Sequence, residues 1–227
     1  MKKYIKALLV VSCLFISSCA EKMYYYAKYS IDLTEIEKPD KTKKSYEVKK
    51  SSSIDDNQIN EFSFDDDNIS IIWIPGAKGF SFKLENKTDS SIKIIWDEAL
   101  LIDEKNRSLA VIHSGIKFAE REKSQVPSII VRHSIFEDTI VPSENISYKT
   151  PTYYKGMQIS GGWQQDEFIP SSFWGYEDES KTWQNEIEGM MLGKKFQVLL
   201  PLEIKSKIKE YIFSFKINAI EVKLKKR

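Results

Sequence analysis

Apolar and polar residues alternate regularly along much of this chain. Successive side chains of a strand point to opposite faces, so such a pattern places the apolar residues on one face of a strand. Two such sets lie between residues 80 and 106, separated by a polar turn: Phe80, Phe82 and Leu84, and then Ile92, Ile94 and Trp96. We expect the second strand to return beside the first as a hairpin, with facing apolar stripes that begin the core.

The same period of two continues toward the C-terminus. Pro201 lacks a backbone donor, so the strand over 196–204 is predicted to lie at a sheet edge or to contain a bulge. Near the end of the chain the alternation slips by one residue, which predicts a bulge near Asn218 and Ala219. No amphipathic helix is expected. Further strands are predicted over 69–73, 99–103, 108–113, 128–132 and 135–141, and from residue 211 onward.

Many short strands separated by turn signals favour an antiparallel β-sandwich. By length, residues 61–227 make one such domain. The predicted fold class is therefore all-β.

Residues 150–190 depart from the alternating pattern and form a predicted insert loop. Aromatic residues and glycines are dense in this segment. The rings could stack on a sugar or peptide ligand, or they could cap one end of the sandwich and bury their large apolar area there. The possible ligand-binding residues are Tyr153, Trp163, Trp174, Tyr176 and Trp183.

The N-terminus carries a targeting signal. Three lysines precede an apolar run from Ala7 to Ile16, which is shorter than the roughly 20 residues of a membrane-spanning helix. The Ile-Ser-Ser-Cys sequence that ends at Cys19 resembles the lipobox of bacterial lipoproteins. The resemblance implies that residues 1–18 are a cleaved signal peptide and that Cys19 carries a lipid anchor. An ordinary signal peptide that happens to end in cysteine is the alternative.

Cysteine usage and charge exclude several classes of site and partner. Cys13 is lost with the signal and Cys19 is used by lipidation, so the mature chain has no disulfide and no thiolate metal site. Loss of three lysines changes the formal net charge from +1 to about −2, which argues against a nucleic-acid partner. The partners expected instead are the membrane, through Cys19, and an envelope protein or glycan.

Residues 19–60 are predicted to be a lipid-anchored flexible tether. From Ser30 to Asn60 apolar residues are sparse and charges are dense, so little burial offsets the ordering entropy. The tyrosines at 24–26 and 29 suit a membrane interface, and they could equally begin a first strand. In Gram-negative lipoproteins an aspartate after the lipidated cysteine commonly retains the protein in the inner membrane, so the resemblance implies that a chain with Ala20 goes to the outer membrane, with its periplasmic face as the preferred location.

A second resemblance covers Phe80 to about Ser143. The motifs are F-x-L-x-N-x-T, I-x-I-x-W, V-I-H-S-G at 111–115 and D-x-I-V-P at 138–142. This segment is similar to uncharacterised bacterial envelope lipoproteins that carry an immunoglobulin-like sandwich. The resemblance implies that fold and brings no catalytic residues.

No pattern of residues typical of an enzyme is present in the sequence. His113 and His133 are the only histidines, and neither has the spacing of a zinc site. The function predicted first is a non-enzymatic envelope lipoprotein that supports structure or protein interaction, with no cofactor and no metal. A glycan- or peptide-binding lipoprotein that uses the aromatic insert is the alternative, and an enzyme ranks last.

Overall fold

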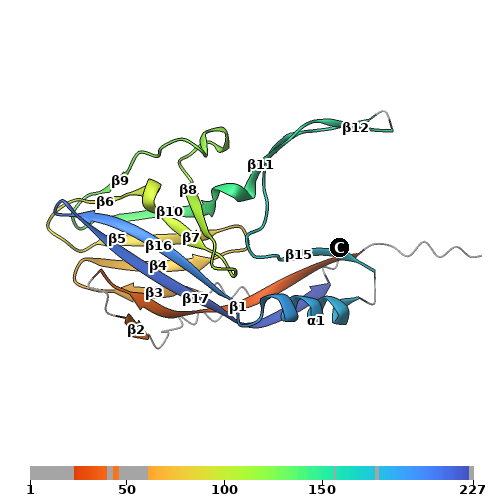
Figure 1. Cartoon of the computed structure of the whole chain (residues 1–227), viewed down its shortest axis with the longest axis horizontal. Helices are drawn as coiled ribbons and strands as arrows, with labels where there is room; N and C mark the ends of the chain where they lie inside the picture. Colours follow the sequence, from red (N-terminus) through yellow and green to blue (C-terminus); the bar gives the residue numbers. More distant parts are fainter. Residues whose placement is uncertain (1–22, 40–42, 46–60, 156, 177–178, 225–227) are drawn as a thin grey trace, which may run out of the picture.

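The computed structural model describes residues 23–39, 43–45, 61–155, 157–176 and 179–224, and their fold is mostly antiparallel β (Figure 1). One curled sheet of 13 strands dominates, and its main path runs β15-β1-β17-β16-β7-β8-β10-β5-β4-β3. The strands on this path are β1 (Met23–Glu37), β3 (Phe62–Asp65), β4 (Ile69–Pro75), β5 (Phe80–Asn86), β7 (Leu100–Ile102), β8 (Ser108–His113), β10 (Ile135–Pro142), β15 (Ser172–Gly175), β16 (Lys195–Ile204) and β17 (Lys207–Leu224). Three short strands lie off it, β2 (Lys43–Ser45), β6 (Ile92–Ile94) and β9 (Ser128–Ile130).

The curled sheet folds its two halves against each other around an aromatic core. The Trp73 ring on β4 is fully buried, 5.3 Å from the Phe213 ring and 6.2 Å from the Phe215 ring on β17. Every second residue of β16 from Phe196 to Ile204 is also buried. The all-β prediction is confirmed, while the immunoglobulin-like topology stays a prediction.

The predicted hairpin over 80–106 is wrong in its pairing and right in its buried faces. β5 pairs with β4 and β10, whereas β6 pairs with β16 and β9. The Phe82 and Trp96 rings therefore meet across the core, with centroids 6.4 Å apart. The buried Asn86 carboxamide explains the crossing, because its NH₂ group donates to the carbonyls of Ser90 and Ile130 and ties the turn to β9.

Pro201 lies inside a central strand without a bulge, so the predicted edge or bulge is wrong. The Pro201 carbonyl accepts a hydrogen bond from the Ile95 amide at 3.1 Å. In an antiparallel ladder the N–H and C=O of one residue face the same neighbour. The missing N–H thus faces the short helix η1 (Trp96–Glu98), which separates β6 from β7, and no ladder bond is lost there.

The bulge predicted near Asn218 and Ala219 is confirmed. Ser30 pairs with Ala219 and the next residue, Ile31, pairs with Ile217, so Asn218 is the extra residue. A bulge bends the strand and restores the phase of its buried side chains. The bulge lies in the pair formed by β1 and β17, the two longest strands of the molecule.

The flexible tether predicted over 19–60 is wrong for residues 23–37. These residues form β1, which pairs with β17 along nearly its whole length and with β15 at its beginning. Tyr25, Leu33 and Ile36 are buried, and the outward positions carry tyrosines in the first half of the strand and mostly polar or charged residues in the second half. A register shift between Leu33 and Glu35 changes the phase of the apolar residues, which hides the strand from a period-two search.

The insert predicted as a loop contains strands and a helix. One long, interrupted hairpin pairs β11 (Ile146–Lys149) with β14 (Gly162–Gln165) and, beyond the interruption, β12 (Thr152–Tyr154) with β13 (Met157–Ile159). The helix α1 (Ser180–Met191) corrects the expectation of no helix. Trp183, Ile187 and Met191 recur every four residues, so α1 has one narrow apolar stripe, and it packs on β17.

Two further short helices, η2 (Phe118–Glu120) and η3 (Ser143–Asn145), complete the secondary structure. No helix in the described part of the chain is long and apolar enough to span a membrane. The predicted signal peptide and Cys19 lie outside the described residues.

Candidate functional site

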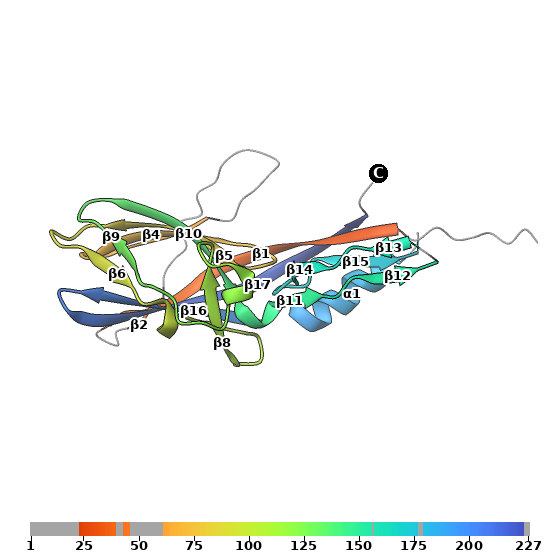
Figure 2. The same ribbon diagram turned by 90° about the horizontal axis from the view of Figure 1, so that it is seen from above.

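Exposed apolar side chains concentrate in one stretch of the sequence. Fourteen large apolar side chains are exposed among the described residues, and nine of them lie between residues 148 and 192. Five of these nine lie on or next to β12, β13 and β15, which reach the same end of the molecule as the beginning of β1 (Figures 1 and 2). Together with Tyr24, we call these five residues the aromatic end: Tyr153, Met157, Ile159, Trp174 and Tyr176.

Trp174 and Tyr24 form the centre of this surface. They are directly opposite each other in the β1–β15 pair, and their rings meet edge to face with centroids 5.2 Å apart. The Trp174 side chain is 63% exposed. The Tyr24 hydroxyl donates a hydrogen bond to the Ser172 hydroxyl at 2.7 Å, which holds the ring at the surface.

A shallow cavity of about 400 Å³ adjoins this pair. Its lining combines two aromatic rings, an alanine and two hydroxyl-bearing side chains: Tyr24, Tyr26, Ala27, Ser171 and Ser172. Apolar ring faces next to a few convergent polar groups are the usual composition of a ligand site.

Glu167 holds the segment that leads into β15. Its carboxylate accepts hydrogen bonds from the backbone N–H and the hydroxyl of Ser171, at 2.6 and 2.7 Å, and from both groups of Ser172, at 3.2 and 2.8 Å. Burial acts to raise the pKa of Glu167, but these four bonds outweigh it and hold the pKa below its usual range. Burial and the nearby Glu167 charge raise the pKa of Tyr29, whose hydroxyl donates to the Pro170 carbonyl.

Trp183 lies on the face of β15 opposite to Trp174, and its ring is packed against the strand rather than exposed. Its ring stacks on Phe173 with centroids 5.2 Å apart and an interplanar angle of 22°. Gly175 leaves room for it, since a β-carbon there would lie 2.5 Å from the Trp183 Nε1 atom. Residues 173 and 174 point to opposite faces of the strand, so Trp174 and Trp183 are separated by the sheet.

Trp163 and Tyr153 lie on the two parts of the interrupted hairpin, Trp163 on β14 and Tyr153 on β12. The Trp163 ring meets Tyr148 edge to face at 5.4 Å, and the Arg121 guanidinium lies 5.1 Å from its centroid. Tyr153 is 76% exposed on β12. Among the described residues no ring contact joins any two of the three predicted tryptophans, so the structure distributes them over separate places.

Part of the insert caps the core, as expected from the second of the two interpretations of its aromatic residues. The Phe168 ring is buried, with its centroid 5.2 Å from that of Phe196 and 6.1 Å from that of Phe80. The neighbouring Ile169 is buried as well. The aromatic residues of the insert therefore divide into a cap and an exposed set.

A second polar cluster was missed at the sequence level. It brings the V-I-H-S-G and D-x-I-V-P motifs together, because the Asp138 carboxylate bonds His113 Nδ1 at 2.9 Å and accepts from the Ser114 hydroxyl at 2.5 Å. The His113 ring stacks on Trp96 at 4.5 Å. In an activated nucleophile the serine hydroxyl bonds the histidine. Here the Ser114 hydroxyl donates to the Asp138 carboxylate instead, an arrangement that holds the turn at 113–115 against β10 and does not activate the hydroxyl.

The arrangement of possible metal ligands was compared across the described residues. No group of three or more histidine, cysteine, aspartate or glutamate side chains there is arranged to hold an ion. His133 lies away from His113 and bonds Asp89 through Nε2 at 3.2 Å.

No protein-family model, curated protein or solved structure matches the chain. The site is therefore interpreted from its own geometry.

Proposed function

We propose that this protein is a lipid-anchored lipoprotein of the bacterial envelope and a non-enzymatic module for interactions at the membrane. The observation that carries the proposal is the position of β1. Met23 begins this strand four positions after Cys19, a distance that extended chain covers in about 14 Å. A lipid on Cys19 would hold a folded domain directly against a membrane.

The exposed aromatic end supports a role in binding. Apolar patches on the surface of a soluble domain usually mark an interaction site, and here the patch adjoins the proposed anchor. The His113–Ser114–Asp138 cluster is arranged to hold a turn rather than to activate a nucleophile, which favours a binding protein over a hydrolase.

A glycan or peptide ligand is the second candidate, and the cavity beside Tyr24 favours it. Ring faces of Tyr24 and Tyr26 would stack on a sugar while the hydroxyls of Ser171 and Ser172 would bond its hydroxyl groups. Titration with envelope glycans, followed by tryptophan fluorescence, tests this candidate. A saturable change that is lost in Trp174→Phe supports it, and no response with any glycan argues against it.

The anchoring is tested by growing cells with labelled palmitate and isolating the protein. The wild-type chain should incorporate the label and remain with the membrane after a high-salt wash, and Cys19→Ser should do neither. Separation of the two membranes on a density gradient tests the proposed location on the periplasmic face of the outer membrane. A wild-type chain that carries no label and is released by salt would contradict the proposal.

A further inference from the structure

We infer that the aromatic end inserts into the surface of the phospholipid bilayer, so that the protein contacts the membrane with a folded surface as well as with its lipid. The inference rests on the proposed anchoring at Cys19 and names the bilayer as the partner of that end of the molecule.

The position of the anchor fixes which end faces the membrane. Met23 pairs with Gly175 and Tyr24 with Trp174, so β1 begins beside the exposed rings of β15. Three residues separate Cys19 from Met23. A linker this short keeps the beginning of β1 near the lipid headgroups, and the neighbouring surface must then face them.

The composition of that surface suits the interface of a bilayer. Tryptophan and tyrosine are enriched at the level of the headgroups, where an apolar ring and a polar tip are both satisfied. Trp174 and Tyr176 are 63% and 47% exposed at the edge of the sheet, and Tyr153 and Met157 are 76% and 67% exposed on the β12–β13 hairpin. The hairpin and the start of β1 lie at the same end of the molecule in both ribbon views (Figures 1 and 2).

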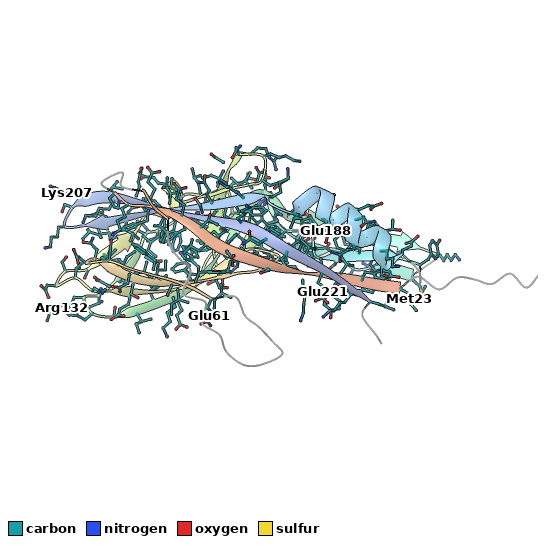
Figure 3. All side chains as sticks on the ribbon, turned by 90° about the horizontal axis from the view of Figure 1, so that it is seen from below. Met23, Glu61, Arg132, Glu188, Lys207 and Glu221 are labelled. Atoms are coloured by element: carbon teal, nitrogen blue, oxygen red, sulfur yellow. The ribbon has the colours of Figure 1, made fainter. Side chains whose placement is uncertain are left out.

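The sequence that follows β17 is basic. Leu224 of β17 pairs with Tyr25, and the sequence continues with three basic residues, Lys225, Lys226 and Arg227. Basic residues near a membrane surface are attracted by anionic headgroups. The opposite end of the molecule, where Lys207 lies in Figure 3, is far from the beginning of β1.

Brominated lipids, which quench tryptophan only within the acyl-chain region, test this contact. Residues 19–227 contain every described element and have Cys19 as the sole cysteine, so a maleimide lipid in the vesicle can supply the anchor chemically. The vesicles consist of phosphatidylcholine brominated in the upper acyl chain with a minor fraction of phosphatidylglycerol. Trp174 emission is obtained as the difference between this chain and its Trp174→Phe variant.

A matched control moves the reporter to the other end. Ile208 is 53% exposed beside Lys207, and Ile208→Trp in the Trp174→Phe background places a tryptophan there. The inference predicts loss of Trp174 emission and unchanged emission from the new tryptophan at position 208. Both substitutions are at exposed positions, and near-ultraviolet circular dichroism checks that the fold is retained.

Unquenched Trp174, or equal quenching at the two positions, would overturn the inference. Its failure is distinguishable from failure of the proposed anchoring, because the anchor here is synthetic. A chain that takes up no palmitate in cells yet shows quenching of Trp174 on these vesicles would disprove natural lipidation and leave the membrane-binding surface established.

Discussion

The body and the aromatic end use the same kind of side chain for opposite purposes. In the body the Trp73 ring is fully buried and touches four phenylalanine rings, with centroids 5.0 to 6.5 Å away. At the aromatic end Trp174 touches Tyr24 alone among the described rings and is 63% exposed. Aromatic content therefore says little about function until the fold shows which rings are covered.

The difference arises from where the sheet has a second layer. β4 and β17 face each other across the core, so rings on their inner faces are enclosed. Beyond the bulge at Asn218 the strands β1, β17 and β15 continue outward, and α1 covers one face of them. Trp174 points to the other face, on which no described helix packs.

Truncation of a buried ring in the body, the part of the molecule in which the two halves of the curled sheet face each other, should change the stability most. Trp73→Ala should lower the free energy of unfolding by about 3–5 kcal/mol, because it leaves a cavity among packed rings. Trp174→Ala, the matched change at the aromatic end, should alter it by no more than about 0.5 kcal/mol. Chemical denaturation of both variants measures the difference. Similar losses in the two variants would contradict the contrast between the regions.

A smaller change in stability is expected from substitutions at Gly175 in β15 and at Gly189 in α1. Gly175→Ala would place a β-carbon 2.3 Å from Glu179 Oε2 and 2.5 Å from Trp183 Nε1, and we expect it to destabilise by about 1–3 kcal/mol. Gly189→Ala meets no atom within 4 Å inside α1 and should stabilise by about 0.5–1 kcal/mol. Thermal unfolding of the two variants should shift in opposite directions. A stabilising shift from Gly175→Ala would contradict the close packing of Trp183 against β15.

The smallest expected change is a dependence of local stability on pH at Glu167, beside β15. The pKa of Glu167 is lowered in the folded chain, so its contribution to stability is present above the unfolded value of about 4.3 and is lost as pH falls through the folded value. Acid should therefore release Ser171 and Ser172 and change Trp174 emission before the body unfolds. The change is measured by fluorescence titration. Glu167→Gln should abolish this early step, and its persistence in that variant would assign it to another group.

Much of the body could be predicted from the sequence. Alternation located β5, β8, β10 and β16, and the phase slip located the bulge at Asn218. Pairing could not be predicted in the same way, because alternation fixes the buried face of a strand and not its neighbour. The chain crosses from β5 to β6 through a turn held by the Asn86 side chain, which looks like any hairpin turn in the sequence.

The aromatic end was predicted in composition and not in structure. β1 was hidden because its apolar residues change phase between Leu33 and Glu35, and α1 because it buries a single narrow stripe. Exposure of Trp174 and burial of Phe168 depend on long-range pairing with β1 and on packing against Phe196. No local pattern distinguishes those two rings, so the exposed set could be found only in the folded chain.

Energy transfer between the protein and lipid headgroups measures the orientation of the molecule on the membrane. If residues 1–18 are removed and Cys19 is lipidated as proposed, no free thiol remains, so Tyr153→Cys in β12 and Ile208→Cys beside Lys207 each introduce one site for a donor dye. β12 and Lys207 lie at opposite ends of the molecule (Figures 2 and 3). Transfer to acceptor dyes on the headgroups then reports the height of each end. The proposed orientation predicts strong transfer from position 153 and weak transfer from position 208. Equal transfer from the two sites, or stronger transfer from position 208, would contradict it.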